Sequence, residues 1–258
     1  MTIGFIGGGR VTRILLGGWA RAQALPSRVL VYEPDDAAFS QLPGFARSIE
    51  RTRIDEASAA DVVFLALHPP KLREVLPVLR PLLTAHTLVV SLAPKVTLGE
   101  LESGCGTSRV ARIIPNAPSI IGQGYNPVSF ALGMDTAGRA EIVRLFGPLG
   151  ETREVEEPRL EADAILTAMG PTYFWFQWQT LRELGLRFGL TSDDVDVALS
   201  RMLTGSVSTM FQSGFPPSAV MDLVPVKPLA QQEPQIAQTY KDVLVALHAK
   251  IAPERAPV

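Results

Sequence analysis

The chain has 258 residues, of which 47% are hydrophobic, and its formal net charge at pH 7 is −2. This length and apolar content allow a sizeable core and two domains. The balanced charge, without a run of like charges, excludes nucleic acid and anionic membranes as expected partners. The single cysteine, Cys105, excludes an intramolecular disulfide and a cysteine-based zinc site, and the three scattered histidines predict no metal.

The apolar N-terminus lacks a basic leader and a small-residue cleavage site, and Gly7 interrupts it early. No apolar run approaches the roughly 20 residues that a bilayer requires. We therefore expect a cytoplasmic protein without a membrane partner. Cys105 lies in a Ser-Gly-Cys-Gly-Thr stretch that is interpreted as a turn, and we expect its thiol to be inert.

A glycine triplet follows the first predicted strand, residues 2–6, and a helix is predicted from Arg10 to Ala24. Glycine lets the backbone turn sharply and approach a pyrophosphate, and the N–H groups of a helix start hold the anion. The spacing fits the dinucleotide fingerprint except at Thr12, where Gly or Ala is usual. The predicted coenzyme contacts of this loop are Gly7, Gly8, Gly9, Arg10 and Val11.

A second apolar run, residues 29–32, ends at Glu33, roughly 20 residues beyond the glycines, where the fingerprint expects an acid for the ribose hydroxyls. An acid at this position repels a 2′-phosphate and favours NAD over NADP. Arg10 acts in the opposite direction, because a guanidinium beside the coenzyme recruits a phosphate. We expect NAD or NADP, with NAD slightly favoured.

Two further β-branched runs, 61–67 and 87–92, suit buried strands of a parallel sheet, with a helix at 69–83 between them. Ligands of such sheets lie beyond the carboxyl ends of the strands. The residues expected there as coenzyme contacts are Leu67, His68, Pro69 and Ser91. Two of these residues have an equally good alternative interpretation: His68 as a polar residue at a helix start, and Ser91 as a hydroxyl in a local turn. Lys95, a little further on, is interpreted as solvated.

Three more strands and a helix complete the first half: strands at 109–114, 125–132 and 150–155, and a helix capped by Asp135 that runs to Phe146. Prolines on both sides of Asn116 predict a rigid loop at a strand end, and rigid loops position chemistry.

From Pro158 onward strand patterns give way to helical ones, at 158–168, 171–189, 192–213 and 231–251. The fold class predicted is a Rossmann-type doubly wound α/β domain, residues 1–157, followed by an all-helical dimerisation and substrate domain, residues 158–258. One of these helices, 171–189, carries five aromatic residues on several of its faces: Tyr173, Phe174, Trp175, Phe176 and Trp178. A helix that is apolar all round must be enclosed, so we expect a second subunit to cover it.

Several motifs resemble the pyrroline-5-carboxylate reductase family: Pro115-Asn116-Ala117-Pro118-Ser119, Gly122-Gln123-Gly124, Phe146-Gly147-Pro148-Leu149-Gly150 and Gly170-Pro171-Thr172-Tyr173. The resemblance covers residues 1–215. It implies reduction of a cyclic imine with NAD(P)H in proline biosynthesis, and a homodimer through the helical domain that is sometimes stacked into larger rings.

The sequence departs from the family where the substrate should bind. Arg10 stands in place of Asn, and His68 in place of Lys. The Ser-Pro-Gly-Gly-Thr-Thr signature, which cradles the substrate carboxylate in the family, is replaced by Val224-Pro225-Val226-Lys227-Pro228-Leu229. Lys227 supplies a cation that can pair with a substrate acid. We expect Asn116, Thr172 and Lys227 to form the substrate site near the nicotinamide.

The leading interpretation is an NAD(P)H-dependent reductase of a small C=N compound that bears a carboxylate. An iminium arrives protonated and needs no strong general acid, whereas a carbonyl acceptor needs one. The β-hydroxyacid dehydrogenases carry Lys four residues after the glycine that Gly170 matches, and Phe174 stands there instead. Two alternatives stay open: a keto- or hydroxy-acid oxidoreductase that uses His68 or Lys227 as the acid, and a non-catalytic nucleotide-binding dimer.

Overall fold

The computed structural model describes residues 1–42 and 48–252. The chain divides into two compact units, one made of Met1–Met169 with Leu247–Val258 and the other of Gly170–Ala246. The chain passes from the first unit to the second after the π-helical turn Ala164–Ala168 and just before the helix Pro171–Arg187. The domain boundary expected after residue 157 stays a prediction.

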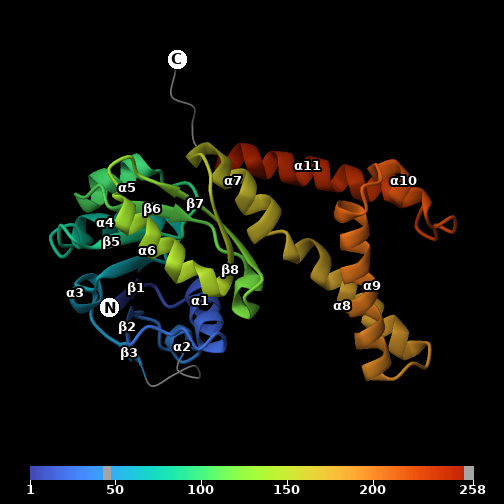
Figure 1. Cartoon of the computed structure of the whole chain (residues 1–258), viewed down its shortest axis with the longest axis horizontal. Helices are drawn as coiled ribbons and strands as arrows, with labels where there is room; N and C mark the ends of the chain where they lie inside the picture. The colour runs from blue at the N-terminus through green and yellow to red at the C-terminus, as the bar shows by residue number, and fades with distance from the viewer. Residues whose placement is uncertain (43–47, 253–258) are drawn as a thin grey trace, which may run out of the picture. The chain divides into compact units, whose positions relative to one another are not determined.

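A single sheet forms the centre of the first unit (Figure 1). Its strands within the described residues are β1 Thr2–Ile6, β2 Arg28–Tyr32, β3 Ile49–Arg51, β4 Val62–Leu65, β5 Leu88–Ser91, β6 Val110–Ile113, β7 Gly124–Phe130 and β8 Gly150–Glu154. Their order is β3-β2-β1-β4-β5-β6-β7-β8, and the pair β6 and β7 is antiparallel while the other neighbours are parallel. The strand order reverses between β1 and β4, which places the ligand-binding crevice of such a sheet at the carboxyl ends of these two strands.

Helices cover both faces of the sheet. They are α1 Arg10–Arg21, α2 Asp36–Phe39, α3 Ile54–Ser58, α4 Pro69–Leu79, α5 Leu98–Cys105, α6 Thr136–Phe146 and the single turn α7 Leu160–Asp163. One core cluster contains side chains of α1 and α6, such as Trp19 and Phe146. The other contains side chains of α3, α4 and α5, such as Leu72 and Leu101. The expected doubly wound fold is therefore confirmed.

Alternate residues of β1 serve the two cores. Phe5 stacks on Phe64 of β4 with ring centroids 4.9 Å apart, and the Trp19 indole N–H donates to the Leu145 carbonyl oxygen at 2.7 Å. Burying one Phe side chain stabilises a fold by about 1.5–3 kcal/mol. This aromatic cluster fixes α1 against β1 and so sets the geometry of the glycine turn between them.

The second unit consists of helices: α8 Pro171–Arg187, α9 Ser192–Gln212, α10 Pro217–Asp222 and most of α11 Glu233–Ile251. Three aromatic side chains of α8, those of Phe174, Trp175 and Phe176, stay exposed in the single chain, and Phe176 is 64% accessible, whereas Tyr173 and Trp178 are partly buried. None of the helices in the described part of the chain is long and apolar enough to span a bilayer.

The structure corrects several details of the sequence analysis. Helix α1 ends at Arg21, before Gln23 adopts a φ of +54°. Cys105 closes α5 and does not lie in a turn; the turn residue is Gly106, whose φ is +70°. Residues 164–168, predicted to continue a helix, form a π-helical turn. The elements β3, α3, α5 and α10 were not predicted.

The missed helix α5 has an explicit start signal. The Thr97 hydroxyl accepts the Glu100 N–H, and the Glu100 carboxylate accepts the Thr97 N–H, which is a capping box. Gly104 hid this helix from prediction, because glycine is unfavourable inside helices and indicates a turn. A Cβ at Gly104 would lie 2.8 Å from a Leu76 methyl, so close packing against α4 requires the glycine.

Candidate functional site

The glycine turn occupies the switch point of the sheet, between β1 and β4. Gly7 has a φ of +109°, and a Cβ there would lie 2.5 Å from the Ala66 carbonyl oxygen. A Cβ on Gly8 would lie 2.9 Å from the Glu33 Cβ. These two glycines are required by the packing of the protein itself, since L side chains are strained at that φ and excluded at those distances.

Gly9 differs from both, because a Cβ added there meets nothing within 4 Å in the described part of the chain. Gly9 is exposed and caps α1 without a side-chain hydrogen bond, and it has an unstrained φ of −74°. The first helical turn, which includes Arg10 and Val11, therefore begins at a glycine with open space on its Cβ side, and its first N–H groups have no partner within the helix. Amide donors at a helix start, with no side chain in front of them, fit the diphosphate of a dinucleotide.

Thr12 replaces the small third residue of the fingerprint, and the structure explains how it is accommodated. Its side chain is fully buried, and the hydroxyl donates to the Gly7 carbonyl oxygen at 2.7 Å. The extra side chain thus bonds to the turn and does not push α1 away from β1.

Glu33 follows β2 and braces the same turn. One carboxylate oxygen accepts the Gly8 N–H at 2.7 Å, and the other accepts the Asp35 N–H at 2.9 Å. An ionised carboxylate has about four acceptor positions, so it can still accept ribose hydroxyls. Two more carboxylates, Asp35 and Asp36, follow it in sequence, and Arg51 pairs with Asp36 at 2.5 Å.

The other expected coenzyme contacts lie at neighbouring strand ends. Leu67 lies beside the glycine turn, since its methyl group would be 3.1 Å from a Cβ on Gly7. His68 is exposed and caps α4, whose first residue is Pro69, without a side-chain hydrogen bond. Ser91 is buried, and its hydroxyl accepts the Ala93 N–H at 3.3 Å. The hydroxyl of Ser91 thus serves the local turn.

Asn116 lies after β6, at the start of the 3₁₀ helix Ala117–Ile121. Its side-chain oxygen accepts the Tyr125 N–H at 3.1 Å, and its amide donates to the Thr167 carbonyl oxygen at 3.3 Å. An amide group offers two donors and two acceptor positions, so one of each is left for a ligand.

Thr172 and Lys227 belong to the second unit, and they line different cavities. Thr172 lies at the start of α8, beside a mainly apolar cavity of about 500 Å³ with Tyr173 and Tyr240. Lys227 is exposed between α10 and α11 and lines an open cavity of about 660 Å³ together with Asp222 and Glu233.

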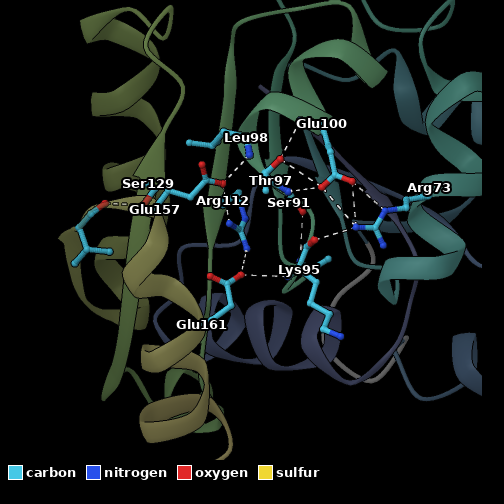
Figure 2. Close-up of polar contacts among 12 residues, drawn as sticks. Arg73, Ser91, Lys95, Thr97, Leu98, Glu100, Arg112, Ser129, Glu157 and Glu161 are labelled. Atoms are coloured by element: carbon cyan, nitrogen blue, oxygen red, sulfur yellow. Dashed lines mark hydrogen bonds and ion pairs between the residues drawn. The ribbon is translucent and has the colours of Figure 1, made fainter. Parts of the chain in front are cut away.

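A charged cluster at the carboxyl end of β6 was missed by sequence reasoning. Arg112, whose side chain is fully buried, forms ion pairs with Glu157 at 2.7 Å and with Glu161 at 2.5 Å (Figure 2). The available signal was an arginine inside an otherwise apolar strand, because a buried arginine requires carboxylate partners.

Burial raises the pKa of the Cys105 thiol to about 11, so the thiol is protonated near neutral pH, as expected of an inert cysteine. Among the described residues, no group of three or more His, Cys, Asp or Glu side chains is arranged to hold a metal ion.

Known proteins resemble this chain over most of its length. Residues 2–95 match the family described as NADP oxidoreductase, coenzyme F420-dependent. Pyrroline-5-carboxylate reductase of Glycine max is 30% identical over 223 residues, covering 86% of this chain and 81% of the relative. The Escherichia coli K12 enzyme of the same name is 27% identical, covering 86% and 84%. The crystal structure of Plasmodium falciparum pyrroline carboxylate reductase with NADP bound has a TM-score of 0.82 at 19% identity, covering 98% and 97%.

The doubly wound sheet, with a glycine turn at its switch point and an acid after β2, defines an NAD(P)-dependent oxidoreductase of the Rossmann type. The sequence identity of 30% with the Glycine max relative, over 86% of this chain, shows the family within this class. The chain belongs to the pyrroline-5-carboxylate reductase family.

Proposed function

We propose that the protein uses NAD(P)H to reduce the C=N bond of a small cyclic imine that carries a carboxylate, the reaction for which its relatives are named. The observation that carries this proposal is the open space beside Gly9, the residue at which α1 begins, in a chain of this family. NAD(P)H supplies the hydride when it is bound.

Each coenzyme contact has a proposed role. The amides of Gly9, Arg10 and Val11 hold the diphosphate, while Gly7 and Gly8 make the turn possible and the Gly8 N–H is held by Glu33. Glu33 accepts the ribose hydroxyls of the adenosine half. Leu67, His68 and Pro69 form the strand-end surface toward the nicotinamide half, and the buried Ser91 hydroxyl supports it by holding the turn after β5. We propose NAD as the preferred coenzyme, because three carboxylates after β2 oppose a 2′-phosphate while Arg51 is engaged by Asp36.

For the substrate, we propose that Lys227 pairs with the carboxylate. The roles expected of Asn116 and Thr172 in orienting the imine stay predictions from the sequence, because Thr172 lines a different cavity from Lys227. Asp222 and Glu233 share the cavity of Lys227, so its attraction for an acid is moderated by two negative charges. A protonated imine accepts a hydride without further acid catalysis, so this residue set suits an iminium better than a ketone.

We propose that the protein is a homodimer in the cytoplasm, joined through its helical unit. The exposed aromatic side chains of α8 and the apolar cavity between α8 and α11 support this proposal. Large exposed apolar surfaces mark interaction sites, and a second copy with the same surface buries both. A sedimentation velocity experiment in which the protein remains a monomer at micromolar concentration would contradict it.

A substrate panel tests the activity. Purified protein is incubated with NADH or NADPH and either cyclic imine carboxylates, such as pyrroline-5-carboxylate, or keto acids of similar size, and oxidation is followed at 340 nm. The proposal expects turnover with the imines. Turnover with keto acids alone favours the keto-acid alternative. Coenzyme binding without turnover on any compound favours a non-catalytic nucleotide-binding dimer.

A further inference from the structure

A buried ion cluster holds two backbone amides of the loop that follows β5 (Figure 2). The Glu161 oxygen that pairs with Arg112 also accepts the Lys95 N–H at 3.2 Å. The Glu157 oxygen that pairs with Arg112 also accepts the Leu98 N–H, at 2.6 Å. Each carboxylate therefore joins the guanidinium to the segment from Lys95 to Leu98.

Lys95 is held in an unusual conformation at this point. Its φ is +67°, in the left-handed region that favours glycine. Its N–H is bound by Glu161, and its carbonyl oxygen accepts a hydrogen bond from the Arg73 guanidinium at 2.9 Å. Pro94 precedes it, and turns with proline before a left-handed residue normally use glycine there. The charged partners thus fix a backbone conformation that a lysine rarely adopts.

Stability alone does not account for this cluster. Two buried atoms, the Arg112 Nε and the second Glu161 oxygen, have no hydrogen-bond partner among the described residues. Buried ion pairs can often be replaced by apolar side chains without loss of stability, and unsatisfied buried atoms are costly. A cluster that is poorly optimised for stability but bonded to a strained strand-end residue points to a positioning role.

The place of the loop after β5 in the sheet indicates which part of the coenzyme it contacts. Sheets of this strand order consist of two mononucleotide-binding halves. The glycine turn and Glu33 belong to the half formed by β1 to β3, so the adenosine end of the coenzyme lies there. Strands β4 to β6 form the other half, and the segment after β5 lies at their carboxyl ends.

We propose that Glu161 and Arg112 are positioning residues for the nicotinamide half of the coenzyme. By holding the Lys95 N–H, they keep the loop after β5 in the shape against which the nicotinamide end binds. This inference rests on the proposed coenzyme use, and it assigns neither residue a contact with the reacting atoms.

The test compares two ligands, NADH and ADP-ribose, which lacks the nicotinamide. In the double variant Arg112→Met/Glu161→Leu, apolar side chains replace the ion pair. Its Kd for NADH is expected to rise about tenfold, or about 1.4 kcal/mol, while its Kd for ADP-ribose stays within about twofold. Asp163→Asn is the matched control, because it removes a buried carboxylate of the same helical turn that pairs with Arg159 at 3.1 Å. Both Kd values of this control should be unchanged.

Rescue and independent variants separate positioning from a general loss of structure. Adding Lys95→Gly to the double variant should restore NADH affinity, because glycine adopts the left-handed conformation without the hydrogen bond. Lys95→Val, which leaves the ion pairs intact, should weaken NADH but not ADP-ribose, because a β-branched residue cannot occupy that φ.

An unchanged ratio of the two Kd values in Lys95→Val overturns the inference, even if the double variant does not fold. Equal weakening of both ligands also overturns it, since that result indicates only a structural role. A wild-type protein that binds NADH but reduces no imine contradicts the proposed function alone and leaves this ratio measurable.

Discussion

The Thr12 hydroxyl donates a hydrogen bond to the Gly7 carbonyl oxygen at 2.7 Å, inside the turn that joins β1 to α1. The residue that departs from the dinucleotide fingerprint thereby stabilises the turn. Thr12→Val keeps the shape and removes the hydroxyl, which leaves a buried carbonyl without this donor. We expect a loss of about 1 kcal/mol in the free energy of unfolding, measured in urea. A Thr12→Val variant as stable as the wild type would contradict a role for the hydroxyl.

The glycines of the turn are expected to separate into structural and ligand-facing positions. Gly7→Ala should lower stability by about 1–3 kcal/mol, because its φ is positive and the Ala66 carbonyl blocks a Cβ. Gly9→Val should leave the melting temperature unchanged and raise the Kd for the coenzyme about 100-fold. Gly99→Ala is the control, since its added Cβ also meets no described atom within 4 Å. Normal coenzyme affinity in Gly9→Val would remove this loop from the binding site.

Glu33 should determine coenzyme choice. Glu33→Ser removes a carboxylate that opposes a 2′-phosphate, and it also frees the Gly8 N–H that the carboxylate binds. We expect the ratio of NADP to NAD affinity to rise about tenfold in titrations with both coenzymes. Glu33→Gln, which loses only the charge, should give a smaller change in the same direction. A constant ratio in both variants would show that Glu33 has no role in selectivity.

Substitution of Lys227 should change the KM for the substrate and leave the affinity for the coenzyme unchanged. Lys227→Ala is expected to raise KM for an acidic imine about tenfold, because a hydrogen bond to a charged group contributes about 1.5–3 kcal/mol. Lys227→Arg should retain most of the affinity. Lys241→Ala, an exposed lysine of α11 in the same unit, is the control. Wild-type kinetics in Lys227→Ala would exclude Lys227 as a ligand.

Cys105 should be unreactive in the folded protein. Its pKa lies at about 11, above the usual 9.0, so folding favours the protonated thiol. The protonated Cys105 thiol therefore makes its full contribution to the free energy of unfolding below pH 9, and this contribution is lost as the pH rises from 9 toward 11. Iodoacetamide at pH 8 should label Cys105 only after unfolding in urea. Rapid labelling of the native protein would contradict its burial.

The sequence predicted the parts of the fold that local patterns encode. Continuous apolar runs indicated β1, β2, β4, β5 and β6, and the glycine triplet located the coenzyme turn. Asp135 was correctly expected to cap α6, since its carboxylate accepts the Gly138 N–H. These features are determined by residues that are close together in the sequence, so the sequence alone predicts them.

Other features depend on contacts between distant residues. The pairing of Arg112 with Glu157 and Glu161 joins positions 45 and 49 residues apart. Lys95 was interpreted as a solvated side chain, and the sequence could not show that its left-handed backbone bonds to the buried Glu161 carboxylate. Likewise, the short helix α5 contains a glycine that only the packing against Leu76 explains.

The central claim is that this chain transfers a hydride from NAD(P)H to an imine carbon. The most direct measurement uses coenzyme that carries deuterium at the nicotinamide C4, with pyrroline-5-carboxylate as the acceptor. NMR of the product should show one deuterium at the carbon of the former C=N bond, from one face of the coenzyme. If the coenzyme binds but every imine carboxylate stays unlabelled, the chain does not catalyse this transfer.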